Sequence, residues 1–207
     1  GYIIKSRHDR QDTTDGRGGG ILVYVSQRLT AHEERPVTAM NVNQCSCVHL
    51  TMKSRNFKLF TVYRSPNSSP ENNDAVNTLI RSADRNAIFV GDFNYPTIDW
   101  EKMTGETSQE KRFVEAAADK FLAQHVSFPT RKSNLLDLIL ADDGIAIEDV
   151  RRTGKLGTSD HDMIEFMIAC KHDDVGPPPT IQMVPNFERA DFNSMRNEIS
   201  EQNRHRD

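Results

Sequence analysis

The segment Ala87–Asn94 (AIFVGDFN) joins a short apolar run to an acidic turn, and two other segments combine the same elements. In Leu135–Leu140 (LLDLIL) one aspartate interrupts an apolar run, and in Gly157–Ile168 (GTSDHDMIEFMI) the dipeptide Asp-His precedes one. Short apolar runs bounded by turn residues are typical of buried β-strands. Three acidic sites on such strands predict a sheet that holds carboxylates and an imidazole over a phosphate, as metal-dependent hydrolases do.

The composition indicates one polar domain. With 207 residues and 36% hydrophobic residues, the chain can form a two-layer core with a large loop fraction. No apolar stretch approaches the roughly 20 residues that cross a membrane, and no signal segment is visible. The net charge of −4 argues only weakly against DNA, because catalytic carboxylates contribute to it. Cys45 and Cys47 would share one strand face, so reduced intracellular thiols are expected.

The apolar pattern predicts an α+β fold in which sheets and helices form layers. One helix is expected from Pro70 to about Asp84. A second is expected from the capping-box sequence Thr107–Glu110 through about Gln124, with Phe121 among its apolar positions. Strands are expected at Tyr2–Ile4, Ile21–Val25, Cys45–Met52, Phe57–Tyr63, Ala87–Val90, Leu135–Leu140, Ile145–Arg152 and Met163–Ala169.

The chain is expected to divide near residue 172. Residues 1–172 contain all of these strands and helices and are expected to form one domain. Asp173–Pro179 ends in three prolines, which favour an extended spacer, and Phe187 could begin another helix. Residues 173–207 are therefore interpreted as a linker and the start of a connector.

Asp160 and His161 form the most informative pair. A carboxylate beside an imidazole lets one side chain hold Mg²⁺ while the other donates a hydrogen bond to a developing oxyanion. The alternative is a polar turn that caps a strand. Asp137 interrupts an apolar strand, where an unpaired carboxylate is costly to bury, so His161 is expected as its partner. The alternative for Asp137 is an edge position that faces water.

Asp92 and Asn94 flank Phe93, so in extended backbone both would point the same way and could grip a water and a phosphate oxygen. An ordinary strand end is the alternative. Tyr63–Asn67 and Thr130–Arg131 place polar donors in loops, where they could bind phosphate or be loop residues only. The remaining histidines show no ligand spacing and are interpreted as packing or surface residues: His8, His32, His49, His125, His172 and His205.

Taken together, these motifs resemble the endonuclease/exonuclease/phosphatase superfamily; in chain order they are Tyr63–Pro66 (YRSP), Gly91–Asn94 (GDFN), Thr130 through Asp137, and Ser159–His161 (SDH). Within it, the chain is most similar to the endonuclease domain of non-LTR retrotransposons. That likeness rests on Asp9-Arg10 with Gly18–Gly20, on Gly91–Trp100 (GDFNYPTIDW) and on Pro129–Leu140. It covers about residues 1–169, and residues 187–199 resemble the connector that leads toward a reverse transcriptase.

The resemblance implies a two-sheet β-sandwich flanked by helices, and Mg²⁺- or Mn²⁺-dependent nicking of DNA. A DNA substrate in turn implies a nuclear location, and the connector-like residues 187–199 indicate that a reverse transcriptase domain could follow in the same polypeptide. No membrane is expected, because no apolar stretch is long enough to span one. The family roles carry over by motif: Asp92 would orient or deprotonate the attacking water, with Asn94 positioning it. Tyr63 and Thr130 would contact the phosphate, Asp160 would bind the metal, and His161, oriented by Asp137, would stabilise the transition state.

The chain departs from the family pattern at its beginning. Family members carry an Asn on the first strand and a metal-binding Glu on a following strand, both upstream of the residues that match Gly1. Glu33 and Glu34 come too late to replace that Glu. We therefore expect a domain that lacks its first strands, with weak or absent activity as this fragment and an exposed sheet edge that favours aggregation.

Two other functions stay open. One is a phosphatase or lipid phosphodiesterase of the same superfamily, against which the connector-like tail argues. The other is a non-catalytic remnant, which the missing upstream ligands favour and the intact downstream motifs disfavour.

Overall fold

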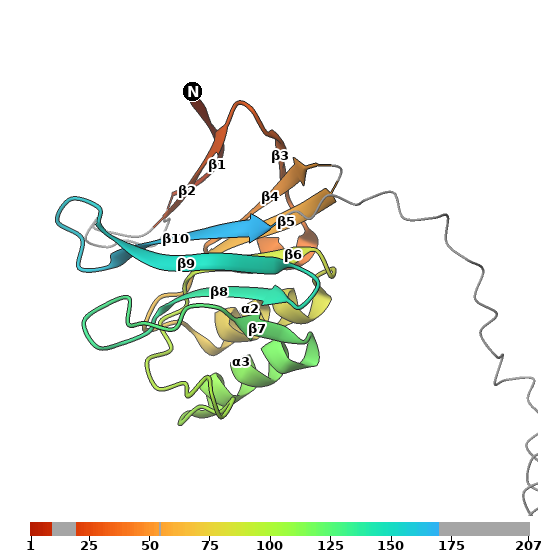
Figure 1. The fold of residues 1–207 in the computed structure, drawn as a ribbon. Helices are drawn as coiled ribbons and strands as arrows, with labels where there is room; N and C mark the ends of the chain where they lie inside the picture. The colour runs from red at the N-terminus through yellow and green to blue at the C-terminus, as the bar shows by residue number, and fades with distance from the viewer. Residues whose placement is uncertain (10–19, 54, 170–207) are drawn as a thin grey trace, which may run out of the picture. The chain divides into compact units, whose positions relative to one another are not determined.

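The computed structural model describes residues 1–9, 20–53 and 55–169 (Figure 1). The linker and connector expected over residues 173–207 lie outside the described residues, as do Arg10 and Gly18-Gly19. No helix among the described residues is long and apolar enough to cross a membrane. Cys45 and Cys47 are buried and unpaired, as expected.

A six-stranded mixed sheet forms the centre of the fold. Its strands lie in the order β3-β4-β5-β6-β8-β7. Neighbouring strands are antiparallel except β5 and β6, which are parallel and joined through the crossover helix α2 (Pro70–Ser82). The strand bounds are β3 Thr30–Glu34, β4 Cys45–Met52, β5 Arg55–Tyr63, β6 Ala87–Asp92, β7 Leu122–Gln124 and β8 Asp137–Asp142.

Both faces of this sheet are buried. One face packs against α2 and α3 (Ser108–Asp119) through residues such as Phe60 and Phe89, whose rings stack with centroids 4.9 Å apart. The opposite face contributes Val48, Ile88 and Ile139 to a second apolar layer. Strands covered on both faces become nearly continuous apolar runs, which accounts for the runs that identify β6 and β8 in the sequence.

Two β-hairpins cover the second face. β1 (Tyr2–His8) pairs with β2 (Ile21–Ser26), and β9 (Ala146–Lys155) pairs with β10 (Asp162–Ala169), both antiparallel. Figure 1 shows β9 and β10 on the side of the sheet opposite to α2 and α3. The predicted α+β class is confirmed. Within the described residues, the second layer consists of these two separate hairpins rather than one continuous sheet.

Both long helices begin where the sequence predicts. Ser69 caps α2 by accepting a hydrogen bond from the N–H of Asn72. Thr107 and Glu110 form the predicted capping box of α3. The buried carboxylate of Glu110 also accepts hydrogen bonds from the N–H and hydroxyl of Thr97. The start of α3 therefore anchors the long loop that follows β6. The short helix α1 (Val37–Met40) lies between β3 and β4 in the chain.

The end of α3 differs from the prediction. The helix ends at Asp119 rather than near Gln124, and Leu122–Gln124 forms β7, which pairs with the edge of β8. Phe121, expected on the apolar side of the helix, has a φ of 53° and is 83% exposed. This left-handed residue reverses the chain so that Leu122 is buried instead. The backbone N–H and C=O groups of Leu122–Gln124 then form hydrogen bonds with β8 in place of those that further helical turns would have formed.

The buried guanidinium of Arg64 connects the loops that follow β5 and β6. Arg64 is 3% exposed. Its Nη1 donates to the carbonyl oxygens of Phe93 at 3.2 Å and Asn94 at 3.1 Å, and its Nε donates to Asn73 Oδ1 at 2.7 Å. The guanidinium carbon lies 3.9 Å from the centroid of the Tyr95 ring. Of the two roles open to Arg64 from the sequence, the structure supports that of a loop residue and not that of a solvent-facing phosphate donor.

We expect Arg64→Lys to lower the free energy of unfolding by about 2–3 kcal/mol, because lysine cannot reproduce the forked donors and leaves buried carbonyl oxygens unpaired. Urea denaturation measures the loss. Arg112→Lys is the matched control, since the ion pair of Arg112 with Asp74 is 63% exposed on both sides and contributes little. Equal effects of the two substitutions would show that Arg64 does not hold these loops.

Candidate active site

Three side chains from distant parts of the chain gather at one end of the sheet: Asp92 at the end of β6, Asp137 at the start of β8, and His161 just before β10. Their ligand atoms all lie within 4.8 Å of one another. Asp137 Oδ2 is 2.8 Å from His161 Nδ1, the contact expected from the sequence, and His161 Nε2 is 3.9 Å from Asp92 Oδ2. The three side chains are 14–24% exposed, so solvent reaches all of them.

Strand pairing places the two carboxylates together. β6 and β8 run antiparallel, so the end of one meets the start of the other, and Asp92 is the direct register partner of Asp137. Gly91 is required beside them: its φ is 137°, and a Cβ there would lie 2.0 Å from the carbonyl oxygen of Val62. Only glycine allows this approach of β6 to β5. The glycine that precedes Asp92 in the sequence is the signal for this close approach.

The loop that contains His161 is fixed by Thr130 and Ser159. The N–H of Asp162 donates to the carbonyl oxygen of Thr130 at 2.8 Å, and the N–H of His161 donates to Ser159 Oγ at 3.1 Å. Thr130 is fully buried, and its Oγ1 accepts hydrogen bonds from the N–H groups of Leu136 and Asp137. Thr130 therefore positions the start of β8, and its contact with a phosphate stays a prediction.

Burial and charge repulsion act on Asp92. Desolvation, reinforced by the neighbouring carboxylate of Asp137, raises the pKa of Asp92 to about 6, while His161 and the N–H of Asn94 oppose the shift. A carboxyl group with this pKa exchanges protons readily near neutral pH, which is the property of a general base.

Asn94 does not adopt the extended backbone expected from the sequence. Its φ is 50°, in the left-handed region, which Asn tolerates better than most residues. The backbone N–H of Asn94 donates to Asp92 Oδ1 at 3.0 Å, whereas its side-chain amide donates to the carbonyl oxygen of Arg64 at 2.8 Å. The turn after β6 thus orients the Asp92 carboxylate through the backbone of Asn94.

Asp160 precedes His161 in the chain, and its side chain pairs with a partner outside the three gathered residues. Its carboxylate is 55% exposed, and Oδ2 accepts a hydrogen bond from Arg131 Nε at 2.7 Å. This guanidinium holds the pKa of Asp160 below its usual range. Asp160 is thus ionised and reachable from solvent, although it is not among the side chains within ligand distance of one another.

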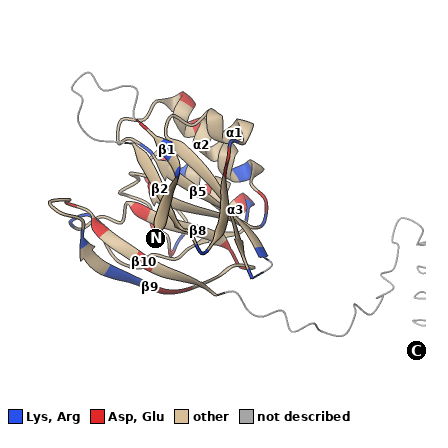
Figure 2. Ribbon diagram, turned by 90° about the horizontal axis from the view of Figure 1, so that it is seen from above, with Lys and Arg blue, Asp and Glu red and all other residues tan. Residues whose placement is uncertain are grey.

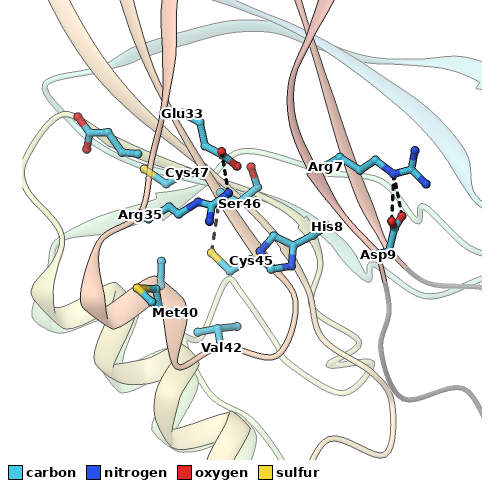
Figure 3. Close-up of a pocket in the computed structure, with 12 residues that line it drawn as sticks. Arg7, His8, Asp9, Glu33, Arg35, Met40, Val42, Cys45, Ser46 and Cys47 are labelled. Atoms are coloured by element: carbon cyan, nitrogen blue, oxygen red, sulfur yellow. Dashed lines mark hydrogen bonds and ion pairs between the residues drawn. The ribbon is translucent and has the colours of Figure 1, made fainter.

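Tyr63 ends β5 next to Asp92, its register partner in β6. It lines a polar cavity of about 450 Å³ together with Ser65, Asn67 and Asn72. A second cavity, of about 400 Å³, lies at the start of β4 and is drawn in Figure 3; its lining includes the ion pair of Glu33 with Arg35, together with Arg7, Asp9, Cys45 and Cys47. Asp92, Asp137 and His161 line neither of these two cavities.

The donor set suits a divalent cation. Carboxylate oxygens are the ligands that Mg²⁺ and Mn²⁺ prefer, and Asp92 and Asp137 supply them within reach of one imidazole. The carboxylate of Asp160, which precedes His161 in the chain, would be a further oxygen ligand if the ion drew it from Arg131. The residues present therefore fit a divalent metal.

The fold matches solved structures of the endonuclease/exonuclease/phosphatase superfamily. The endonuclease domain of TRAS1, a telomere-specific non-LTR retrotransposon, is 16% identical with a TM-score of 0.63, over 82% of this chain and 81% of that one. A superfamily protein from Leptotrichia buccalis is 14% identical with a TM-score of 0.55, over 82% and 72% of the two chains. A mannosyl-6-phosphatase from Bacteroides thetaiotaomicron is 14% identical with a TM-score of 0.52, over 82% and 78%.

The sequence itself identifies the family. The model of the endonuclease–reverse transcriptase family matches residues 57–165, more than half of the chain, and the chain belongs to this family. A search of curated protein sequences found no match. The matched region contains Asp92, Asp137 and His161, together with Tyr63, Thr130 and Asp160. Because solved structures with this fold include both an endonuclease and a phosphatase, the fold alone does not select the substrate.

We expect Asp92→Asn to stabilise the metal-free protein by up to about 3 kcal/mol at pH 7.5. The folded-state pKa of about 6 lies above the ordinary 3.8, so burial favours the protonated carboxyl. The stability contributed by the protonated Asp92 carboxyl is fully present below pH 4 and is lost as the pH rises through 6. The difference in the free energy of unfolding between Asp92→Asn and the parent protein should therefore grow over this interval. Urea denaturation in EDTA between pH 3.5 and 7.5 measures it. The exposed Asp143→Asn is the control; a pH-independent advantage of Asp92→Asn would refute the raised pKa.

Proposed function

We propose that this chain is a metal-dependent phosphodiesterase domain that nicks DNA, with Mg²⁺ or Mn²⁺ as its cofactor. The observation that carries the proposal is the meeting of Asp137, His161 and Asp92: His161 Nδ1 is hydrogen-bonded to Asp137, and its Nε2 lies 3.9 Å from Asp92 Oδ2. Membership in the endonuclease–reverse transcriptase family and the likeness to the TRAS1 endonuclease domain support DNA as the substrate.

In the proposed reaction, Asp92 takes a proton from the attacking water as the water oxygen forms its bond to phosphorus. The bond from phosphorus to the leaving oxygen breaks, and that oxygen takes a proton from solvent water. Asp137 accepts a hydrogen bond from His161 Nδ1–H, which fixes the orientation of the imidazole ring. His161 Nε2 then donates to a phosphoryl oxygen, whose negative charge grows in the transition state. Asn94 supports Asp92 through its backbone N–H.

We assign Asp160 to the metal, and Tyr63 to the phosphate, as the family motif implies. When bound, the divalent ion would supply positive charge to the phosphate oxygens. Thr130 is proposed as a positioning residue behind Asp137.

Basic residues of β9 lie next to this end of the sheet. Arg151, Arg152 and Lys155 lie on β9, which pairs with β10 directly after His161. Figure 2 shows basic residues along β9, beside its turn into β10. Arg151 and Arg152 are paired with acidic side chains of β10, with Glu165 at 2.8 Å and Asp162 at 3.3 Å. A nucleic-acid backbone that contacts this strand would compete with these partly exposed ion pairs for the two guanidinium groups.

We further propose that the domain boundary falls near residue 172, with residues 173–207 as the linker and connector toward a reverse transcriptase in the same polypeptide. Target-primed reverse transcription would place the nicking reaction in the nucleus. The second candidate function is phosphomonoester hydrolysis, which the likeness to the mannosyl-6-phosphatase favours.

Supercoiled-plasmid nicking tests the proposal. This chain and the full-length product of its gene are each incubated with plasmid and Mg²⁺ or EDTA, beside a panel of sugar and inositol phosphates. We expect Mg²⁺-dependent nicking by the full-length product, weaker or absent for this chain alone, and reduced about 100-fold or more by His161→Ala and by Asp137→Asn. Asp143→Asn, an exposed aspartate, is the matched control and should nick normally.

The outcomes separate the candidates. Phosphate release from the panel without nicking would replace the nuclease proposal with that of a phosphatase. Activity on neither substrate, by either form, would identify a non-catalytic domain.

A further inference from the structure

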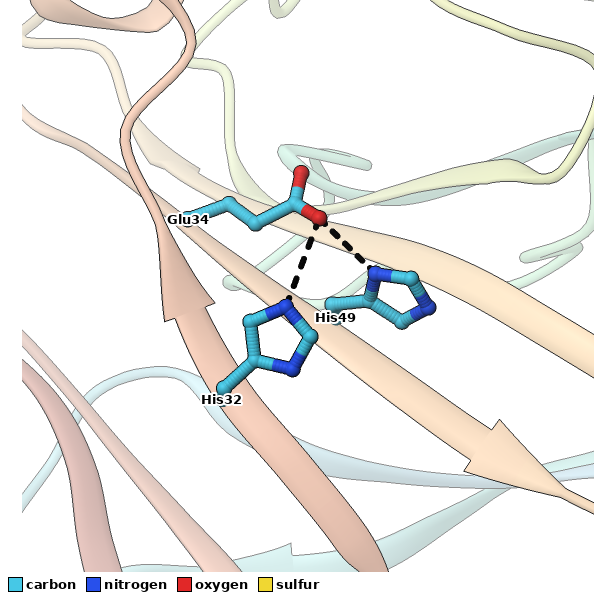
Figure 4. Close-up of side chains that lie close together, drawn as sticks. All are labelled: His32, Glu34 and His49. Carbon is cyan, nitrogen blue, oxygen red and sulfur yellow. Dashed lines mark hydrogen bonds and ion pairs between the residues drawn. The ribbon is translucent and has the colours of Figure 1, made fainter.

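A second group of metal-ligating side chains lies on β3 and β4. Among the described residues, His32, Glu34 and His49 place their ligand atoms within 4.8 Å of one another. Glu34 Oε1 is 2.8 Å from His49 Nδ1 and 3.6 Å from His32 Nε2, and Figure 4 shows both rings directed at this oxygen. Two imidazole nitrogens and one carboxylate oxygen thus converge, and a cation that replaces the proton of the Glu34–His49 hydrogen bond would take all three as ligands.

Strand pairing preforms this group. His32 and His49 are direct register partners, and Glu34 follows His32 by two residues on the same face of β3. The two rings have centroids 4.7 Å apart and are tilted by 33°. Lys58, on the next strand, binds the other carboxylate oxygen of Glu34 at 3.3 Å and leaves Oε1 directed at the histidines. Such outer partners orient metal ligands in known sites.

The donor types select the class of ion. Imidazole nitrogens favour Zn²⁺, Co²⁺, Ni²⁺ and Cu²⁺ over Mg²⁺ and Ca²⁺. Two His and one carboxylate, with a fourth position open to water, form a common tetrahedral zinc set. Ligand atoms in such a tetrahedron are roughly 3.3 Å apart, and the observed 2.8 Å and 3.6 Å lie on either side of this value. His32, with 62% of its side chain exposed, leaves the open position accessible.

We propose that His32, Glu34 and His49 form a binding site for a divalent ion of the zinc class, which clamps the edge strand β3 to β4. The site lies far from the candidate active site. His49 pairs with Lys58 and Lys58 with Ala87, the first residue of β6, whereas Asp92 is its last. Five residues along an extended strand span roughly 16 Å. The proposal is therefore independent of the proposed nuclease function.

Direct metal titration tests the site. The chain is prepared with His161→Ala, which removes the only imidazole of the candidate active site, and is freed of metal. It is then titrated with Zn²⁺ by calorimetry and with Co²⁺ by visible absorption. We expect one ion per chain, a dissociation constant of about micromolar order, Co²⁺ bands of four-coordinate geometry, and a higher melting temperature with Zn²⁺.

Variants at the ligands give the decisive comparison. In the same background, His32→Ala and His49→Ala should each weaken Zn²⁺ binding by at least about 10-fold. His8→Ala, which removes an exposed histidine on β1, is the matched control and should leave binding unchanged. Because His32 is largely exposed, its replacement should preserve the fold, as a melting curve in EDTA will show. Undiminished binding in both ligand variants, or no binding in the background protein, would overturn the proposal.

Discussion

The register between β6 and β8 is the constraint on which the candidate active site depends. It sets Asp92 directly opposite Asp137, within reach of His161. Because successive side chains point to opposite faces, a slip of one residue would turn one carboxylate into the other layer. Apolar partners on both faces oppose such a slip: Phe89 pairs with Leu140 beneath the helices, and Ile88 and Ile139 fill the hairpin side. The two apolar layers therefore determine where the chemistry can occur.

The same layers make the site electrostatically unfavourable in isolation. Burial disfavours two adjacent carboxylates, and the raised pKa of Asp92 expresses this cost. His161 compensates Asp137 at 2.8 Å. The buried guanidinium of Arg64 donates hydrogen bonds to the carbonyl oxygens of Phe93 and Asn94, so a positive charge stabilises the turn that follows Asp92. A bound divalent cation would offset the remaining negative charge, which is the arrangement expected where activity is favoured over stability.

The sequence allowed the strongly periodic parts of the fold to be predicted, and the pairing of Asp137 with His161 followed from the cost of an unpaired carboxylate in an apolar strand. What it could not indicate depends on contacts between distant segments. The sequence of β3 is polar because β3 is an edge strand. The helix α3 ends before Leu122 because Leu122–Gln124 pairs with the otherwise unpaired edge of β8. The burial of Thr130 and the left-handed backbone of Asn94 likewise arise only once the loops pack together.

The two groups of ligand atoms show why spacing along the chain is a weak guide to sites on a sheet. His32 and Glu34 are two residues apart, but the third ligand, His49, comes from the neighbouring strand, where register rather than sequence distance sets its place. Asp92 and Asp137 are farther apart still and are joined by the same rule, whereas loop hydrogen bonds through Thr130 and Ser159 bring His161 to them. Their donors differ: carboxylate oxygens dominate one group and imidazole nitrogens the other. The register of one sheet thus brings together two donor sets from distant parts of the chain, one richer in the oxygen ligands that suit Mg²⁺ or Mn²⁺ and the other in the imidazole nitrogens that suit ions of the zinc class.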